Sequence, residues 1–117
     1  MLQAIIPKIP FIEKEKTLDF YLKQLGFNLI SDYGDYMILE KDNLEIHFFS
    51  YQSLEKEKSD FMLYIRVTDI ETFYQTLIKN NVKIHPNGAL ERKPWNQTEF
   101  SIIDPNGTLL TFGENLK

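Results

Sequence analysis

The side chains able to do chemistry in this 117-residue chain include two histidines and seventeen carboxylates, and there is no cysteine. Without cysteine, the chain has no disulfide framework, no thiolate zinc site and no cysteine nucleophile. His47 lies in LEIHFF, where apolar residues alternate with others, and His85 precedes a turn in KIHPNG. Neither histidine stands in a pattern that assigns a Ser-His-Asp arrangement or a carboxylate pair. We expect His47 to face a cavity and His85 to be structural or exposed.

The single tryptophan, Trp95, stands in the polar stretch KPWNQ, ahead of two apolar runs separated by Asp104-Pro105-Asn106-Gly107. Its polar neighbours favour a ring at the rim of the fold, with a place in the core as the alternative. A flat ligand stacked on such a ring gains roughly 0.5–1.5 kcal/mol beyond burial. The run 104–107 is interpreted as a turn without catalytic role, because proline fixes φ and glycine accepts a positive φ.

Further polar side chains lie on expected strands. Met62, Tyr64 and Arg66 alternate along MLYIRV, so they share one strand face. Arg66 either meets a ligand on that face or forms an internal ion pair with a carboxylate. Glu40 and Glu45 flank a turn and are expected beside the nearby histidine, as solvated charges that could attract a cation.

Composition bounds the class of protein. A chain of this length, 43% hydrophobic and 14% aromatic, predicts one domain over 1–117 with a real core. The net charge is −4 and the basic residues are dispersed, which argues against a nucleic-acid partner. No stretch approaches eighteen apolar residues, so we expect no membrane span. The N-terminus lacks a basic start followed by a long apolar run, so we expect no signal peptide and a cytoplasmic protein.

Two stretches have helical periodicity. In TLDFYLKQLGF (17–27) and DIETFYQTLIKNN (69–81), apolar residues recur at helical spacing and form one buried face. Gly26 is expected to end the first helix. Asp69 is expected to cap the start of the second, and Asn80 and Asn81 to end it.

Strand-like stretches surround both helices and predict a repeat. One precedes each helix (3–9 and 62–67), and three follow each (27–33, 36–41 and 44–50; 82–86, 98–104 and 108–113). The order is therefore β-α-β-β-β twice, in pseudo-repeats of about 1–50 and 61–117 joined by a charged, solvated and mobile linker, 51–60. We predict an α+β fold in which two such units form a concave mixed sheet, with the helices outside and a cavity inside.

These paired units, with FYLKQLGF in the first and FSIIDPNGTLLTF in the second, resemble the vicinal-oxygen-chelate superfamily. That group includes glyoxalase I, extradiol dioxygenases, fosfomycin-resistance enzymes and bleomycin-resistance proteins. The resemblance implies metal ligands near Ile6, near Met62 and at Thr111. Isoleucine has no donor atom, a thioether suits soft metals and a lone hydroxyl is a poor ligand. We therefore expect no metal, no cofactor and no Lewis-acid chemistry that depends on a metal.

Two further stretches, AIIPKIPF and KPW…EFSIIDPNG, are similar to the metal-free bleomycin-resistance branch of the superfamily. This resemblance implies a homodimer that exchanges its N-terminal strand and holds a flat drug, unaltered, in crevices at the subunit interface. It implies stacking between Trp95 and Tyr36. The full set of candidate ligand contacts is Trp95, Tyr36, Tyr64, Arg66, His47, Phe49 and Met62, although Tyr36 and Phe49 could equally fill the sheet.

The function that this resemblance implies is sequestration of a planar, cationic antibiotic of the bleomycin group, without catalysis. Two alternatives remain open. One is a metal-free carrier or sensor of another aromatic small molecule, which would need the same apolar crevice. The other is a metal-dependent enzyme of the glyoxalase or dioxygenase type, against which the missing ligand residues argue.

Overall fold

The computed structural model describes residues 1–116 and contains two helix-and-sheet units in sequence. In the first unit, β1 (Lys8–Phe11) leads into α1 (Lys14–Leu18), which continues as the π-helical segment η1 (Asp19–Gln24), followed by β2 (Asn28–Asp32), β3 (Tyr36–Lys41) and β4 (Leu44–Ser50). A short 3-10 helix, η2 (Lys56–Lys58), lies in the linker. The second unit contains β5 (Met62–Arg66), α2 (Ile70–Lys79), β6 (Glu91–Lys93), β7 (Gln97–Ile103) and β8 (Leu109–Asn115).

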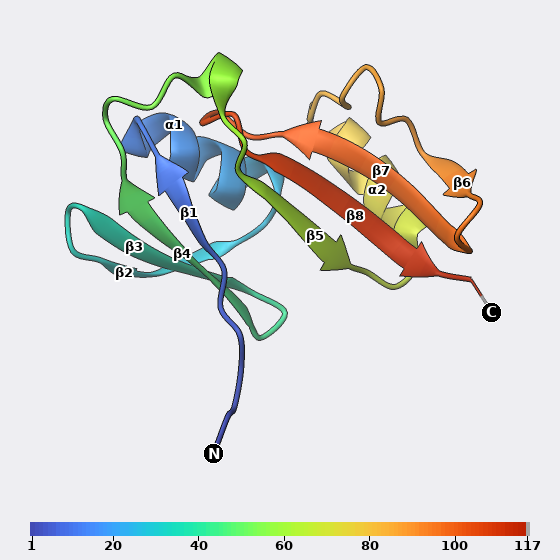
Figure 1. The fold of residues 1–117 in the computed structure, drawn as a ribbon, viewed down its shortest axis with the longest axis horizontal. Coiled ribbons are helices and arrows are strands. Elements are labelled where there is room, and N and C mark those ends of the chain that lie inside the picture. The colour runs from blue at the N-terminus through green and yellow to red at the C-terminus, as the bar shows by residue number, and fades with distance from the viewer. Residues whose placement is uncertain (117) are drawn as a thin grey trace.

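Each unit forms a four-stranded mixed sheet, ordered β1-β4-β3-β2 in the first and β5-β8-β7-β6 in the second. The β1–β4 and β5–β8 pairs are parallel and the others antiparallel. The sheets lie side by side, with the helices covering the same side of both (Figure 1). The predicted α+β class and its two βαβββ units are confirmed.

The core lies between the sheets and the helices. Residues of both units form one buried cluster, in which Tyr21 meets Phe48 edge to face, with ring centroids 4.9 Å apart, and Phe100 stacks on Phe112 at 5.1 Å. Alternate residues of β3, β4, β7 and β8 point into this core. The intervening residues are therefore left on the face that no helix covers.

The first helix differs from the prediction of 17–27, because it begins at Lys14 and becomes π-helical at Asp19. The amide of Leu25 donates to the carbonyl of Phe20, an i to i+5 bond. Phe20 and the adjacent Tyr21 are both buried, which the wider π turn accommodates.

One predicted strand forms with different bounds, and another does not form. The first was placed at 3–9, but pairing begins only at Lys8, and residues 1–7 run away from the body of the protein (Figure 1). The stretch 82–86 forms only one isolated bridge, Ile84 to Ile102, because the chain turns at once and the amide of Gly88 donates to the carbonyl of His85. The edge strand of the second sheet is instead β6.

The predicted cap of α2 is also wrong. Asp69 lies in the left-handed region, at φ 53°, and makes no side-chain capping bond. The carboxylate of Glu114, from β8, accepts hydrogen bonds from the amides of Asp69 and Ile70 at 2.9 and 3.0 Å. The cap is thus supplied by a residue 44 positions away from Ile70, which local spacing could not reveal.

The turn 104–107 does more than reverse the chain. Asp104 and Asn106 are buried, and Tyr21 donates to a carboxylate oxygen of Asp104 at 2.6 Å. The side-chain oxygen of Asn106 accepts from the amide of Ile12 at 2.8 Å. We call these contacts the polar junction, since they join the first unit to the turn of the second.

The linker packs against this turn. A Cβ on Gly107, whose φ is 86°, would lie 2.9 Å from the carbonyl carbon of Lys56, so only glycine fits. Most linker residues are exposed, as expected for a solvated connection. Within residues 1–116, no helix is both long and apolar enough to cross a membrane.

Candidate ligand-binding faces

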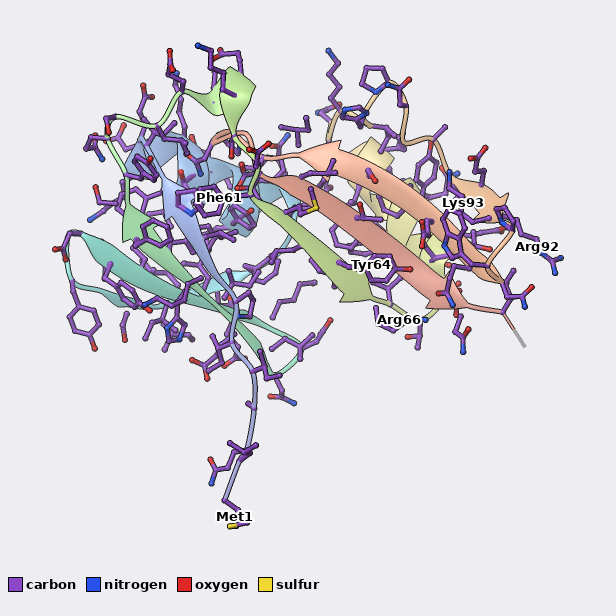
Figure 2. All side chains as sticks on the ribbon, in the orientation of Figure 1. Met1, Phe61, Tyr64, Arg66, Arg92 and Lys93 are labelled. Carbon is purple, nitrogen blue, oxygen red and sulfur yellow. The ribbon has the colours of Figure 1, made fainter. Side chains whose placement is uncertain are left out.

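The two sheets present two uncovered faces. The N-terminal face carries Tyr36, His47 and Phe49, on β3 and β4. The C-terminal face carries Met62, Tyr64, Arg66, Gln97 and Glu99, on β5 and β7, with Trp95 in the turn between β6 and β7. Figure 2 shows Tyr64 and Arg66 on the second sheet and Phe61 near the centre of the molecule.

Trp95 is 60% exposed and is the middle residue of the turn 94–96 that leads into β7, next to Asn96 at φ 62°. Its indole Nε1 donates to Oε2 of Glu99 at 3.0 Å. The ring is therefore not core filler, but it is held by one charge-assisted hydrogen bond.

Tyr64 approaches the same carboxylate. Its hydroxyl donates to Oε2 of Glu99 at 2.6 Å, and desolvation together with this carboxylate raises the pKa of Tyr64 to about 12. A Cβ on Gly113 would overlap with the hydroxyl oxygen of Tyr64 and lie 2.6 Å from its Cζ. Tyr64 can cross β8 to reach Glu99 only because residue 113 has no side chain.

Arg66 donates to Oε1 of Gln97 at 2.7 Å, and its guanidinium carbon lies 5.4 Å from the ring centroid of Tyr64. The partner is thus an amide and not the carboxylate that an internal ion pair would require. Met62 is exposed on the same strand face as Tyr64 and Arg66.

The N-terminal face contains a different network. The Tyr36 hydroxyl and Nδ1 of His47 are hydrogen-bonded at 2.7 Å, and Nε2 of His47 lies 3.1 Å from Oε1 of Glu45. If the hydroxyl donates to Nδ1, a neutral imidazole has its proton on Nε2 and donates it to the carboxylate. The ammonium of Lys8 lies 5.4 Å from the centroid of the Tyr36 ring. Phe49 is half-buried, with Phe61 at 6.0 Å between ring centroids.

A single chain does not bring the predicted stacking pair together. Tyr36 begins β3 in the first sheet, and Trp95 follows β6, the edge strand of the second sheet. Figure 1 shows β3 and β6 on opposite sides of the molecule. The two rings could face one another only if they came from two copies of the chain.

Of the three positions implied for metal ligands, Met62 and Thr111 lie on the paired strands β5 and β8, and Ile6 lies before β1. Ile6 lies in the segment that leaves the body, and Met62 is exposed on β5. The hydroxyl of Thr111 is hydrogen-bonded to that of Ser101 at 2.9 Å. Across residues 1–116, no three His, Cys, Asp or Glu side chains gather as a metal site would require. His85 accepts from the amide of Asn87, a structural role within its turn.

Sequence reasoning missed Glu99, Gln97 and Gly113. A strand period of two that starts from Trp95 places residues 97 and 99 on its face, and a charge inside the apolar run TEFSII was a signal for Glu99. No local sequence feature indicates that residue 113 must be glycine.

A hollow of about 260 Å³ lies away from both faces. It is lined by Ile12, Leu54, Asn106 and neighbouring charged residues, and shares no residue with either face.

Comparisons with known proteins cover almost the whole chain. The family model described as glyoxalase-like domain matches residues 4–117. A bleomycin resistance protein of Klebsiella pneumoniae is 28% identical over 120 residues, covering 98% of this chain and 94% of that protein. One of Staphylococcus aureus is 26% identical over 133 residues, covering 100% and 99%.

Solved structures agree with these relatives. A bleomycin-binding protein crystallised with bleomycin superposes with a TM-score of 0.87 at 28% identity, covering 97% of this chain and 99% of that one. The bleomycin resistance determinant encoded on transposon Tn5 gives a TM-score of 0.88 at 28% identity, covering 97% and 98%.

Proposed function

This chain belongs to the glyoxalase-like domain family, and from that premise we propose that it binds an antibiotic of the bleomycin group and confers resistance by sequestering it unaltered. The observation that carries the proposal is the near-complete match, in sequence and in fold, to a bleomycin-binding protein solved with the drug. The resemblance drawn from the sequence is confirmed at the level of the family and of its bleomycin-resistance relatives.

The binding site in this proposal is a crevice between two copies of the chain. The N-terminal face of one copy supplies Tyr36, and the C-terminal face of the other supplies Trp95. A flat heteroaromatic system between them would be desolvated on both sides. His47, Phe49, Met62, Tyr64 and Arg66 would line the crevice.

The N-terminal segment supports such a dimer. Leu2, Ile5 and Ile6 are exposed, and the segment leaves the body with Met1 at its far end (Figure 2). Burying apolar surface of this kind stabilises by about 25 cal/mol per Å², so a second copy is the natural cover. We propose that the segment crosses to the partner, as the resemblance implied.

Charge supports a cationic ligand. The chain has a net charge of −4, and each face contains a carboxylate next to an aromatic ring, Glu45 on one and Glu99 on the other. Neither carboxylate forms a salt bridge with lysine or arginine within residues 1–116. Their field therefore remains available to a bound cation.

Resistance follows from mass action. Drug held in the crevice is not free to reach DNA, so protection requires protein in excess of drug and a dissociation constant well below the drug concentration. The proposal places the protein in the cytoplasm, where the drug must be intercepted. No metal or other cofactor and no chemical step on the drug is part of this mechanism.

Isothermal titration with metal-free and copper-loaded bleomycin tests the proposal. We expect saturable binding of one drug per chain, quenching of the single tryptophan, and recovery of drug of unchanged mass. The absence of binding at about 100 µM drug, far above a useful affinity, would refute the proposal. About one divalent metal per chain after dialysis, measured by elemental analysis, would instead point to an enzyme.

A further inference from the structure

Three side chains of the C-terminal face are joined at one atom. Oε2 of Glu99 accepts from the indole of Trp95 at 3.0 Å and from the hydroxyl of Tyr64 at 2.6 Å. These residues come from the β6–β7 turn, β7 and β5. The orientations of two aromatic rings from separate elements therefore depend on one carboxylate.

The burial of these three residues shows how the carboxylate acts. Glu99 is only 7% exposed, whereas Trp95 is 60% and Tyr64 48% exposed. The rings thus lie outermost and the carboxylate beneath them. A ligand on this face would touch the rings before Glu99, so Glu99 is suited to act through the rings.

The surroundings preserve this arrangement. Gly113 leaves the space that the Tyr64 hydroxyl occupies, and the nearby Arg66 is turned to the amide of Gln97. Within the described chain, the buried carboxylate therefore has hydrogen-bond donors as partners and no basic side chain within 4 Å. This arrangement places the carboxylate directly behind the two rings.

We propose that Glu99 is a positioning residue, which fixes the planes of Trp95 and Tyr64 and makes this face prefer cationic planar ligands. The inference rests on the proposed function and extends it, since nothing in the match to known proteins assigns Glu99 a role. A negative charge at the indole N–H increases the electron density over the ring, and cations are attracted to that face. The ordered ring also loses less conformational freedom when a flat ligand stacks on it.

The experiment combines two substitutions with a control. Glu99→Gln keeps the shape and removes the charge, and Trp95→Phe keeps a ring and removes the N–H donor. Glu57→Gln removes the same charge from an exposed linker position and serves as the matched control. Bleomycin affinity is measured for the wild type, the three single variants and the Glu99→Gln/Trp95→Phe double variant, with circular dichroism as the test of folding.

We expect Glu99→Gln to weaken bleomycin binding about tenfold, the difference between a charge-assisted and a neutral hydrogen bond. In the Trp95→Phe background the same substitution should cost less, about threefold, because the coupling through the indole is already lost and only the coupling through Tyr64 remains. Glu57→Gln should bind as the wild type does. The preference for bleomycin over bleomycinic acid, which lacks the cationic terminal amine, should decrease in Glu99→Gln.

A readout without ligand separates this inference from the proposed function. The fluorescence anisotropy of Trp95 in the free protein should fall in Glu99→Gln and not in Glu57→Gln. Equal losses of affinity in both backgrounds would show that Glu99 does not act through the indole and would overturn its positioning role for Trp95. Unchanged anisotropy would overturn it too, even if the wild type binds no bleomycin and the proposed function fails.

Discussion

The N-terminal and C-terminal faces use the same components in different ways. On the first, the Tyr36 hydroxyl is connected to Glu45 through the imidazole of His47. On the second, the Tyr64 hydroxyl is bonded directly to a buried carboxylate, which also holds Trp95. The N-terminal network thus runs through a third side chain to an exposed carboxylate, whereas the C-terminal network converges on one buried carboxylate.

The substitution expected to disrupt the C-terminal face most strongly is Gly113→Ala. The added Cβ would overlap with the Tyr64 hydroxyl, so the ring must leave Glu99. We expect a loss of stability of about 1–3 kcal/mol, typical of overpacking, and a loss of bleomycin affinity of at least tenfold. Urea unfolding and calorimetry measure the two effects.

The Tyr64→Ala background provides the control for that experiment. There, Gly113→Ala should cost almost no stability, because the atoms it would meet are gone. An equal cost in both backgrounds would mean that the backbone of β8, and not the Tyr64 ring, requires glycine at this position.

The second prediction concerns Trp95→Ala. The ring is mostly exposed, so stability should change by less than about 1 kcal/mol, while drug affinity should fall about tenfold. A cost of about 3–5 kcal/mol would instead identify a core ring. Thermal unfolding and titration of the same sample decide between these outcomes.

A third prediction sharpens the comparison. Glu45 is exposed and its hydrogen-bond partner is His47, so Glu45→Gln should weaken bleomycin binding by less than about threefold. Glu99→Gln should cost more, because its charge is buried. If the two substitutions cost the same in parallel titrations, the faces do not differ in the way described here.

The smallest expected effect is on the stability of the protein at alkaline pH. The folded-state pKa of Tyr64 is about 12, above its ordinary value of 10, so the folded state holds this proton more tightly. The resulting stability is complete below pH 10 and is lost as the pH rises through 12. Tyr64→Phe should therefore flatten the decline in stability between these pH values. Unfolding midpoints that decline with the wild-type slope would contradict this.

Local sequence signals were enough to predict the fold, but they did not predict the contacts between elements that are distant in the chain. The helical periodicities, the 104–107 turn and the face shared by Tyr64 and Arg66 all depend on neighbours in the chain. The position of Glu99 beneath two rings depends instead on the register of β5 against β8, where Tyr64 pairs with Thr111 and Arg66 with Gly113. Register across a parallel pair is set by tertiary packing, which one sequence does not reveal.

The same limit explains the wrong cap predicted for α2. The capping of α2 by Glu114 requires β8 to lie beside the helix start. The early end of the stretch 82–86 follows from the turn at Pro86 and Gly88, which turn chemistry could have indicated.

The polar junction has a consequence for biosynthesis. Ile12 and Tyr21 leave the ribosome early, but their partners Asn106 and Asp104 follow 94 and 83 residues later. Contacts of such long range are slow to form, so the first unit stays incomplete until the turn 104–107 has been synthesised. We expect nascent chains that stop before Asp104 to be degraded readily in pulse proteolysis, and those that extend past Thr108 to be protected. The turn 104–107 would thus hold the first helix in place.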